Sequence, residues 1–330
     1  MLSRFSRAGI FVFLCFVVAT GGAEVPRVGG DDPILGTHDV VMRHLWTLGA
    51  DDLLIGRLGS IAVDDEGTIF ALDEQLGQVQ VIAADGTWLR SIGREGEGPG
   101  EFRNPTDMFL THDGKVAVVQ QSPAKVALIA PDGTALDDAT LPDATSGYRF
   151  LQRGQATRNG FALVTALLAP SDDGSIGTKV FVETIAADGT RVGQLFGVDS
   201  RIDMVRGTVP ETSIDNVSMY WAATTDDRIV GCARFDEYVL DVRALDGTPL
   251  YEIRRDLPPR PRTDEEFARV GEDFSMTIND REIELIPEPN ARMIDGVVAR
   301  PDGAVWAVLR ETAAIDGAAG RVLRDRKSVV

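Results

Sequence analysis

The chain has 330 residues, 44% of them hydrophobic and 25% charged, which is enough apolar content to bury one large core or two ordinary ones. Its formal net charge is −18, and Lys and Arg form no run before the last few residues. An acidic surface repels phosphate backbones, so we expect no nucleic acid among its partners.

The N-terminus has the pattern of a secretory signal peptide. Arg4 and Arg7 precede an apolar stretch, Ala8–Thr20, which small residues follow up to Ala23. We expect residues 1–23 to be removed and the mature protein to be periplasmic or secreted. The apolar stretch is short for a transmembrane span, so we expect no integral membrane protein after cleavage.

The sequence contains only two cysteines, Cys15 and Cys232. Removal of the signal peptide would leave Cys232 alone, and the mature chain could then form no internal disulfide. Cys232 lies among alternating apolar neighbours, which predicts a buried strand position. A lipoprotein anchor at Cys15 is the alternative to secretion, but Leu14 stands where its motif needs a small residue.

Internal repetition is the strongest signal in the sequence. The tripeptide Asp-Gly-Thr ends four runs in which apolar residues alternate, and its glycines are 47, 56 and 58 residues apart. These glycines are Gly86, Gly133, Gly189 and Gly247, and similar turns recur at Gly67, Gly114 and Gly303. Asp-Gly between two such runs predicts a hairpin, because glycine accepts the positive φ of a tight turn.

Two hairpins per repeat make four strands, and four-stranded repeats of this length are typical of a β-propeller. We predict an all-β fold with one propeller domain over residues 24–324, which contains about four and a half blades of a six-bladed ring. The predicted blades are Leu58–Gly93, Pro105–Pro142, about Tyr148–Gly197, about Asp215–Leu257 and a fifth from about Ala291. We expect Val40–Gly49 to form a lone outer strand that completes the last blade and closes the ring.

One segment departs from the strand pattern. Thr263 and Glu266 have the spacing of a capping box, which predicts a helix over about Asp264–Phe274 within an insertion of residues 263–275. We expect the following residues, 279–290, to be a connector. The insertion could cover the central opening of the ring or lie on the surface without a role.

The glycine-rich stretch IGREGEGPGEFRNP, residues 92–105, has two interpretations. A phosphate loop would feed a helix and would not place three glutamates among its amides. We therefore interpret the stretch as the joint between the first two blades. Phe102 then fills the wedge between them, and Pro105 begins the next inner strand.

This joint, placed between VQVIAADGTWLRS and HDGKVAVV, resembles that of secreted bacterial six-bladed β-propeller proteins related to NHL repeats. The resemblance is specific over about Leu58–Gly133 and continues more weakly to about Arg310. It implies the fold and an exported location, and it implies no particular reaction. Wider relatives of this ring shape include metal-dependent sugar lactonases and a peptide-amidating lyase. Histidines hold the metal of the lyase, whereas the three histidines here lack metal-ligand spacing.

The end of the sequence differs from the repeats. Residues 325–330, DRKSVV, are basic and unpatterned, and they match the translation of a common short-read sequencing adapter. We expect these residues to be non-native, and the natural chain to continue for about one and a half repeats. A genuine short basic tail is the alternative.

Carboxylates at the starts of inner strands are the candidates for a metal site, because these strands begin at the central channel. The candidates are Asp107, Asp215, Asn216 and Asp295. Oxygen ligands that converge on the axis would suit Ca²⁺ or Mg²⁺, although no cofactor is certain. The alternative is that these side chains hydrogen-bond the turns that lead into each strand.

Four further residues are candidates for contacts with an organic ligand. Arg103 and Asn104 lie beside Asp107, and Tyr220 with Trp221 forms the only adjacent aromatic pair. We therefore expect an extracytoplasmic binding scaffold for a protein, peptide or saccharide, without catalysis. The alternative function is a Ca²⁺- or Mg²⁺-dependent hydrolase or lyase of the lactonase kind, with carboxylates at the central channel.

Overall fold

The computed structural model describes residues 27–28, 43–49, 53–142, 147–171, 175–214, 220–232, 234–272, 274, 276–278, 280–300, 303–309 and 325–328. The expected signal peptide, residues 1–23, lies outside these ranges, and so do the metal candidates Asp215 and Asn216. Most of the described chain forms consecutive antiparallel β-sheets, which we call blades.

Blade one shows how the repeats fold. Its strands pair in sequence order because tight turns connect neighbours. They are β2 (Leu58–Val63), β3 (Ile69–Asp73), β4 (Gln78–Ile82) and β5 (Trp88–Ile92). Side chains alternate between the two faces of the sheet. Phe70, Leu72, Val79 and Val81 lie on the face that packs against blade two, and all four are buried.

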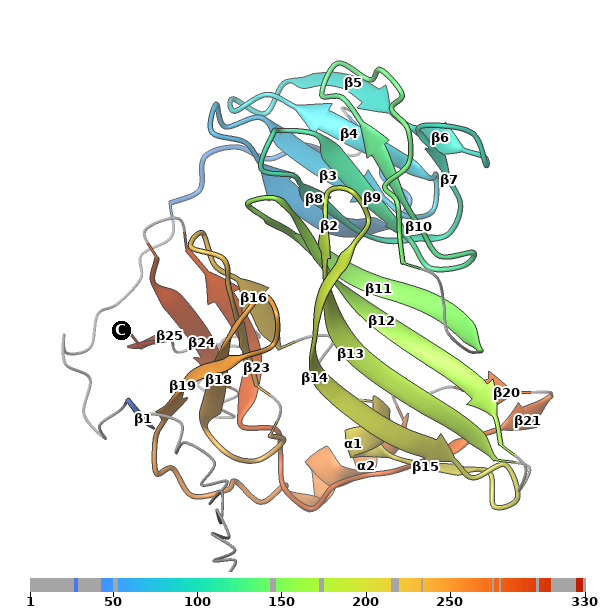
Figure 1. The fold of residues 1–330 in the computed structure, drawn as a ribbon, viewed down its shortest axis with the longest axis vertical. Coiled ribbons are helices and arrows are strands. Elements are labelled where there is room, and N and C mark those ends of the chain that lie inside the picture. The colour runs from blue at the N-terminus through green and yellow to red at the C-terminus, as the bar shows by residue number, and fades with distance from the viewer. Residues whose placement is uncertain are drawn as a thin grey trace, which may run out of the picture.

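Blades two and three repeat this arrangement. Blade two contains β8 (Pro105–Leu110), β9 (Val116–Gln120) and β10 (Lys125–Ile129). Residues 135–139 follow β10 as an irregular edge, held by the Ile129–Ala135 bridge and by the bond from Ala139 N–H to Val126 O (2.9 Å). Blade three contains β11 (Tyr148–Thr157), β12 (Gly160–Pro170), β13 (Ile176–Ala186) and β14 (Arg191–Ile202). These longer strands extend blade three on one side of the molecule (Figure 1).

Blades four and five follow. Blade four contains β16 (Trp221–Ala223), β17 (Arg228–Gly231), β18 (Val239–Ala244) and β19 (Pro249–Arg254). A short strand near the N-terminus, β1 (Arg27–Val28), pairs in parallel with β19 at its outer edge. Blade five contains β23 (Ile294–Ala299), β24 (Val305–Leu309) and β25 (Asp325–Ser328). Part of the tail set apart in the sequence thus takes the third-strand position of blade five.

The blades follow one another around an arc (Figure 1). Their first strands, which we call the inner strands, connect each blade to the next. These inner strands contact one another in the order β2, β8, β11, β16 and β23. A hydrophobic cluster fills each interface from blade one to blade five. In the described part of the chain, no such cluster joins blade five to blade one.

The glycine-rich stretch is the joint that the sequence predicted. Two short strands, β6 (Arg94–Glu95) and β7 (Glu101–Phe102), pair in parallel and fold the stretch back on itself. Phe102 is fully buried in the cluster between blades one and two, and β8 begins at Pro105. Gly93 is required here, because its φ is +72° and an added Cβ would lie 2.6 Å from the Phe102 ring.

Two inter-blade connections, residues 203–214 and 256–290, form an accessory module. It contains β15 (Thr208–Pro210), α1 (Glu211–Ile214), α2 (Asp264–Glu272), β20 (Thr277–Ile278), β21 (Arg281–Glu282) and β22 (Glu284–Ile286). β15 and β22 pair in parallel over a small apolar cluster. Arg262 and Glu211, both buried, join the two connections through a pair of 2.6 Å hydrogen bonds. The module lies at the ends of the long blade-three strands (Figure 1).

The structure confirms the capping box and corrects two other expectations. Thr263 N–H donates to Glu266 Oε2, and Glu266 N–H donates to Thr263 Oγ1, so α2 begins as predicted. The expected connector instead contains β21 and β22, because β15 offers β22 a pairing partner distant in the sequence. Residues 43–49 form no strand, so the expected outer strand over Val40–Gly49 is wrong for its described part.

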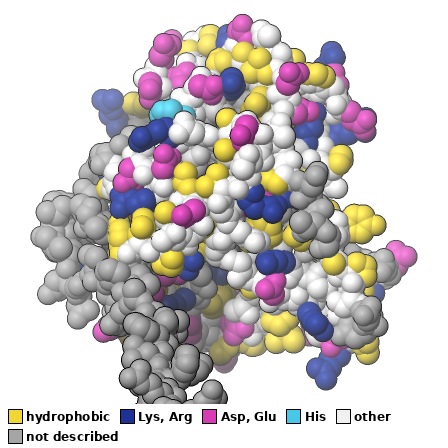
Figure 2. All heavy atoms as spheres, viewed as in Figure 1, with side chains coloured by type: hydrophobic (Ala, Val, Ile, Leu, Met, Phe, Trp, Pro, Cys, Tyr) yellow, Lys and Arg dark blue, Asp and Glu magenta, His cyan; other side chains and the backbone are white. Residues whose placement is uncertain are grey.

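Acidic and basic side chains intermingle over the face of the molecule that Figure 2 shows, with small groups of hydrophobic side chains between them. Mixed charge of this kind keeps a surface soluble without giving it one dominant sign. On the coloured part of this face, the Lys and Arg side chains form no continuous patch.

The four Asp-Gly-Thr turns are stabilised in one way. In each, the threonine N–H donates to the aspartate Oδ1 at 2.8–2.9 Å, and the glycine has a φ between +86° and +96°. The aspartates are Asp85, Asp132, Asp188 and Asp246. The threonine N–H holds the pKa of each carboxyl below its ordinary value of 3.8.

These lowered pKa values predict a contribution to acid sensitivity. The four carboxylates stabilise the fold above the unfolded-state pKa, and this contribution is lost as the pH falls through the folded-state pKa. Replacing all four by Asn keeps an oxygen acceptor but removes the titration. We expect the free energy of unfolding of this variant to fall less steeply below about pH 4 in denaturant titrations. Asp256→Asn, exposed and outside the turns, is the control, and equal slopes for wild type and the fourfold variant would contradict the prediction.

Candidate functional site

The inner strands share a distortion near their first residues. A β-bulge interrupts the pairing of four of them, within Leu58–Ile61, Pro105–Asp107, Leu151–Gly154 and Ile294–Gly296. Counting back from the hairpin turns places Ser60, Asp107 and Arg153 at equivalent positions in blades one to three. Because a bulge re-aims side chains, it brings these polar groups together between adjacent inner strands.

Asp107 is the centre of this cluster. Its side chain is 7% exposed, and its Oδ2 accepts a hydrogen bond of 2.8 Å from the N–H of Gly154 in blade three. Burial raises the pKa of Asp107, although the N–H groups of Gly154 and Met108 and the charge of Arg153 lower it in part. The Ser60 hydroxyl also lowers this pKa, but it does not reach full hydrogen-bond geometry.

This arrangement gives Asp107 a role in joining blades two and three. Gly154 is necessary for it, since a Cβ there would lie 2.3 Å from the ring of Phe109. The absence of a side chain at Gly154 therefore lets the backbone of the next inner strand approach the Asp107 carboxylate closely enough to hydrogen-bond to it. A buried carboxyl with a perturbed pKa is also a property of functional sites, so Asp107 stays a candidate for contact with a ligand at the axis.

The other predicted metal ligands are not brought together in the described residues. Asp295 is half-buried in the bulge of blade five, and Asp215 and Asn216 lie outside the described ranges. Within those ranges, no three His, Cys, Asp or Glu side chains are close enough to hold a metal ion. Burial raises the pKa of Cys232 to about 11, so its thiol is protonated at neutral pH.

Arg103 and Asn104 lie in the turn that leads into β8. The backbone N–H of Arg103 donates to Gln120 Oε1, and its guanidinium pairs with Glu97 at 2.7 Å. Asn104 has a φ of +45°, which the tight turn imposes. Both residues are exposed beside the start of an inner strand, and their contacts here hold the turn.

Tyr220 and Trp221 are core residues, and the expected aromatic platform does not face solvent. Trp221 is 1% exposed and packs in the cluster between blades three and four. Tyr220 is 7% exposed, and the Arg292 guanidinium lies 3.8 Å from its ring centroid and 4.6 Å from that of Phe235. Arg292 and Phe235 had no signal in the sequence, because they meet only through the long connection between blades four and five.

Three side chains of β2 are apolar and exposed on the face of blade one that lies away from blade two, and we call these three the open face. Ala71, Gln80 and Ile82 lie farther out on the same face of the sheet and are buried. Leu58, Ile61 and Val63 point to this face and are 50%, 56% and 57% exposed. In blade two the residues equivalent to Ile61 and Val63 are Met108 and Leu110, which pack against blade one. Preceding blades cover the corresponding positions of blades three to five as well. The open face is thus built like an inter-blade surface but is exposed to solvent.

Trp46 lies at the edge of blade one. Its Nε1–H donates to Ala84 O at 3.0 Å, and its ring covers Gly86 of the Asp-Gly-Thr turn. In later blades, residues from the outer part of the preceding blade cover the equivalent glycine. Ile92 covers Gly133, Thr140 covers Gly189, and the carbonyl of Gln194 lies nearest Gly247, followed by Leu195. Residues 43–49 therefore take the place of a preceding blade's outer strand, although they form no strand.

Comparison with known families agrees with this architecture. A family model described as a "6-bladed beta-propeller" matches residues 45–146, which cover blades one and two. The fold is a β-propeller. The match ends before blade three, so the remaining blades are assigned from their own sheets.

Solved structures with related folds share little sequence with this propeller. An exported-protein candidate from Bacteroides fragilis is 12% identical, with a TM-score of 0.44 over 91% of this chain and 80% of that chain. Virginiamycin B lyase from Staphylococcus aureus is 14% identical, with a TM-score of 0.37 over 83% and 85% of the two chains. A luciferin-regenerating enzyme is 10% identical, with a TM-score of 0.40 over 77% and 69%. At these TM-scores the likenesses say nothing of what this propeller binds.

No curated protein matches the sequence. Among the described residues, no helix combines the length and the apolar content that a membrane span requires.

Substitutions at Asp107 test its structural role. Asp107→Ala removes the acceptor of a buried N–H group, so we expect the free energy of unfolding to fall by about 1–3 kcal/mol. Asp107→Asn keeps an acceptor and removes the buried charge. Because the folded-state pKa is raised, wild type loses stability as the pH rises through that pKa, and Asp107→Asn does not.

Denaturant titrations from about pH 4 to about pH 7 measure this difference. We expect the stability of Asp107→Asn relative to wild type to increase over the range. An equal and pH-independent loss in both variants would show that Asp107 does not act through the hydrogen bond to Gly154.

Proposed function

We propose that this propeller is a non-catalytic binding scaffold that engages a protein or peptide partner through the open face of blade one. The observation that carries the proposal is the exposure of Leu58, Ile61 and Val63 at positions that, in blades two to five, the preceding blade covers fully or in part. Contiguous apolar surface of this kind marks sites of interaction in soluble proteins. The face is aliphatic, which favours a polypeptide over a saccharide, since sugar recognition depends on hydrogen-bonding groups and aromatic rings.

The shape of the open face supports a β-structured partner. Blades two to five each receive a sheet on the equivalent face, with alternating apolar side chains at the interface. A partner that presents an amphipathic hairpin or small sheet would match the same spacing. Trp46 holds residues 43–49 beside the site, where an outer strand of such a sheet would lie.

The proposal places the scaffold outside the cytoplasm. Arg4, Arg7 and the apolar stretch Ala8–Thr20 support this location, because together they have the form of a secretory signal. Detection of the mature protein with residues 1–23 removed, by mass spectrometry of the periplasmic and secreted fractions, would test it.

Site-specific photo-crosslinking in the natural host tests the open face. A photo-reactive amino acid at position 61 should give one dominant crosslinked species, with the crosslinked peptide of the partner in a β-strand or hairpin. The same amino acid at position 192 is the control, because Val192 is an aliphatic residue of blade three that is 42% exposed. Val63→Asp should abolish the crosslink from position 61, because it places a charge in the apolar contact.

Three outcomes would contradict the proposal. Equal crosslinking from positions 61 and 192 would show that the face has no preferred partner. A homodimer, or a crosslink within the chain, would show that the protein covers the face itself.

A measurement with calcium distinguishes the binding scaffold from the alternative function, a metal-dependent hydrolase. If the protein is a scaffold of this kind, millimolar CaCl₂ leaves its melting temperature unchanged, in wild type and in Asp295→Ala alike. A rise in melting temperature that Asp107→Ala and Asp295→Ala both abolish would contradict the non-catalytic proposal, since ligands that converge on a cation stabilise the folded state by mass action.

A further inference from the structure

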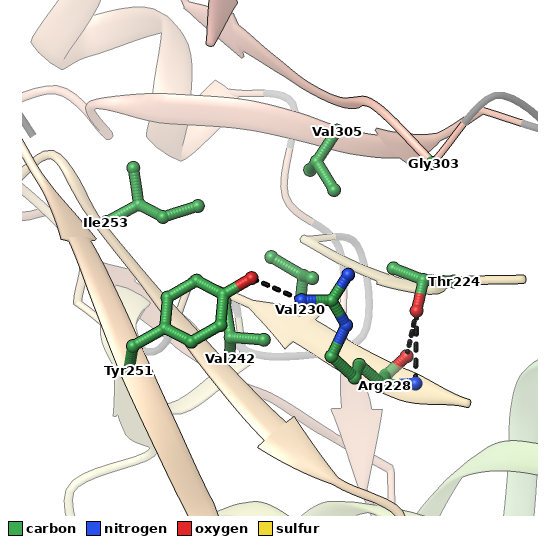
Figure 3. A pocket seen from close by; sticks show the side chains of 8 residues that line it. All are labelled: Thr224, Arg228, Val230, Val242, Tyr251, Ile253, Gly303 and Val305. Carbon is green, nitrogen blue, oxygen red and sulfur yellow. Dashed lines mark hydrogen bonds between the residues drawn. The ribbon is translucent and has the colours of Figure 1, made fainter. Parts of the chain in front are cut away.

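A small cavity lies between blades four and five, away from the open face. It has a volume of about 50 Å³ and is lined by Thr224, Arg228, Val230, Val242, Tyr251, Ile253, Gly303 and Val305 (Figure 3). Strands β17, β18 and β19 form one wall, and β24 forms the other. The walls are aliphatic, and a single guanidinium and a phenol supply the strongest polar groups.

Arg228 extends across this cavity between Tyr251 and Thr224 (Figure 3). Its Nη1 donates to Tyr251 Oη at 2.5 Å, and its Nη2 pairs with Asp226 Oδ2 at 2.7 Å. Its Nε is buried and has no hydrogen-bond partner among the described residues. A guanidinium has five N–H donors, so these contacts leave donors for a ligand.

Tyr251 adds a second donor. Its oxygen accepts the hydrogen bond from Arg228, and the hydroxyl proton can be donated in turn. The charge of Arg228 is retained in the pocket, because the contacts with Asp226 and Tyr251 raise its pKa further. The cavity therefore offers a fixed cation and a neutral hydroxyl donor at one end, with Val230, Val242 and Val305 around the remaining space.

We propose that this pocket binds a short-chain aliphatic monocarboxylate. The carboxylate accepts hydrogen bonds from Arg228 and Tyr251, and its alkyl chain lies against the valines. Planar carboxylates match the fork of a guanidinium, whereas a tetrahedral phosphate would leave its remaining oxygens against aliphatic walls. One water molecule needs about 10–15 Å³ of cavity volume on this measure, so a cavity of about 50 Å³ has room for a few heavy atoms.

Asp226 limits the strength of the site. It pairs with Arg228 from the solvent side and also accepts from Thr224 Oγ1 at 2.6 Å. Its negative charge opposes a second carboxylate at the same guanidinium. Asp226→Asn should therefore bind the ligand more tightly than wild type.

Titration with [¹³C]acetate and [¹³C]butyrate, followed by ligand NMR, tests the proposal. We expect saturable binding in the millimolar range, since ligands of so few atoms have a low ceiling of affinity. Arg228→Gln should weaken binding by at least about tenfold and Tyr251→Phe by about threefold to tenfold, through loss of a charged and a neutral donor. Asp226→Asn should strengthen it.

The matched control is Arg243→Gln. Arg243 belongs to the same blade and contacts an aromatic ring, with its guanidinium 5.2 Å from the Phe196 centroid, but it does not line the pocket. The affinity of Arg243→Gln for acetate and butyrate should equal that of wild type. Val305→Leu gives a second measurement that does not depend on Arg228, because the larger side chain should weaken butyrate more than acetate.

The outcomes decide the proposal in either direction. Selective loss in Arg228→Gln, with Arg243→Gln unchanged, would support it. If Arg228→Gln unfolds, unequal effects of Val305→Leu on the two ligands would support it instead. Equal affinity in Arg228→Gln and wild type, equal effects of Val305→Leu on both ligands, or no saturation by about 100 mM ligand would overturn it.

Discussion

The packing of apolar sheet faces against one another is the constraint on which this propeller depends. A small sheet with apolar side chains on both faces gains stability only when other elements cover it. Each of blades one to four packs against the blade that follows it, and residues from both blades fill each of the four interfaces. Even the connection between two blades contributes to this packing, because Phe102 in the joint is part of the hydrophobic cluster between blades one and two. The open face of blade one is a product of the same design, since it has the surface of an interface without a neighbouring blade in the described structure.

Buried arginines hold together segments that lie outside the interfaces between blades. Arg262 and Glu211 join the two connections of the accessory module, and both are nearly inaccessible to water. Removing one member of such a pair leaves an uncompensated buried charge, so the contact holds the connections in one arrangement. Arg292 fills the space between Tyr220 and Phe235 in a similar way. Tyr220, which the sequence suggested as a ligand contact, is thus covered by a cation of the protein itself. Arg228 differs, because it lies beside a cavity and keeps donors that no described residue uses.

Local signals in the sequence were sufficient for much of the fold. Asp-Gly-Thr predicts a turn because its bonds connect residues two positions apart, and the structure confirms all four. Thr263 and Glu266 are a capping box for the same reason. Residues 43–49 show where such reasoning fails. Their pattern predicted a strand, but a strand needs a partner, and in the structure Trp46 instead binds the turn of blade one. The pairing of β15 with β22 was missed because the two strands lie more than seventy residues apart.

The sequence alone determined the repeat, the turns, the joint at Phe102 and the propeller class, because each depends on neighbours along the chain or on a period repeated through it. Only the tertiary structure decided which side chains face solvent. Trp221 and Ile61 occupy equivalent positions in their blades, yet one is buried and the other exposed. The same reason applies to the candidate sites. Asp107 meets Gly154 only when blades two and three have packed. Arg228 meets Tyr251 only when the strands of blade four have paired into one sheet.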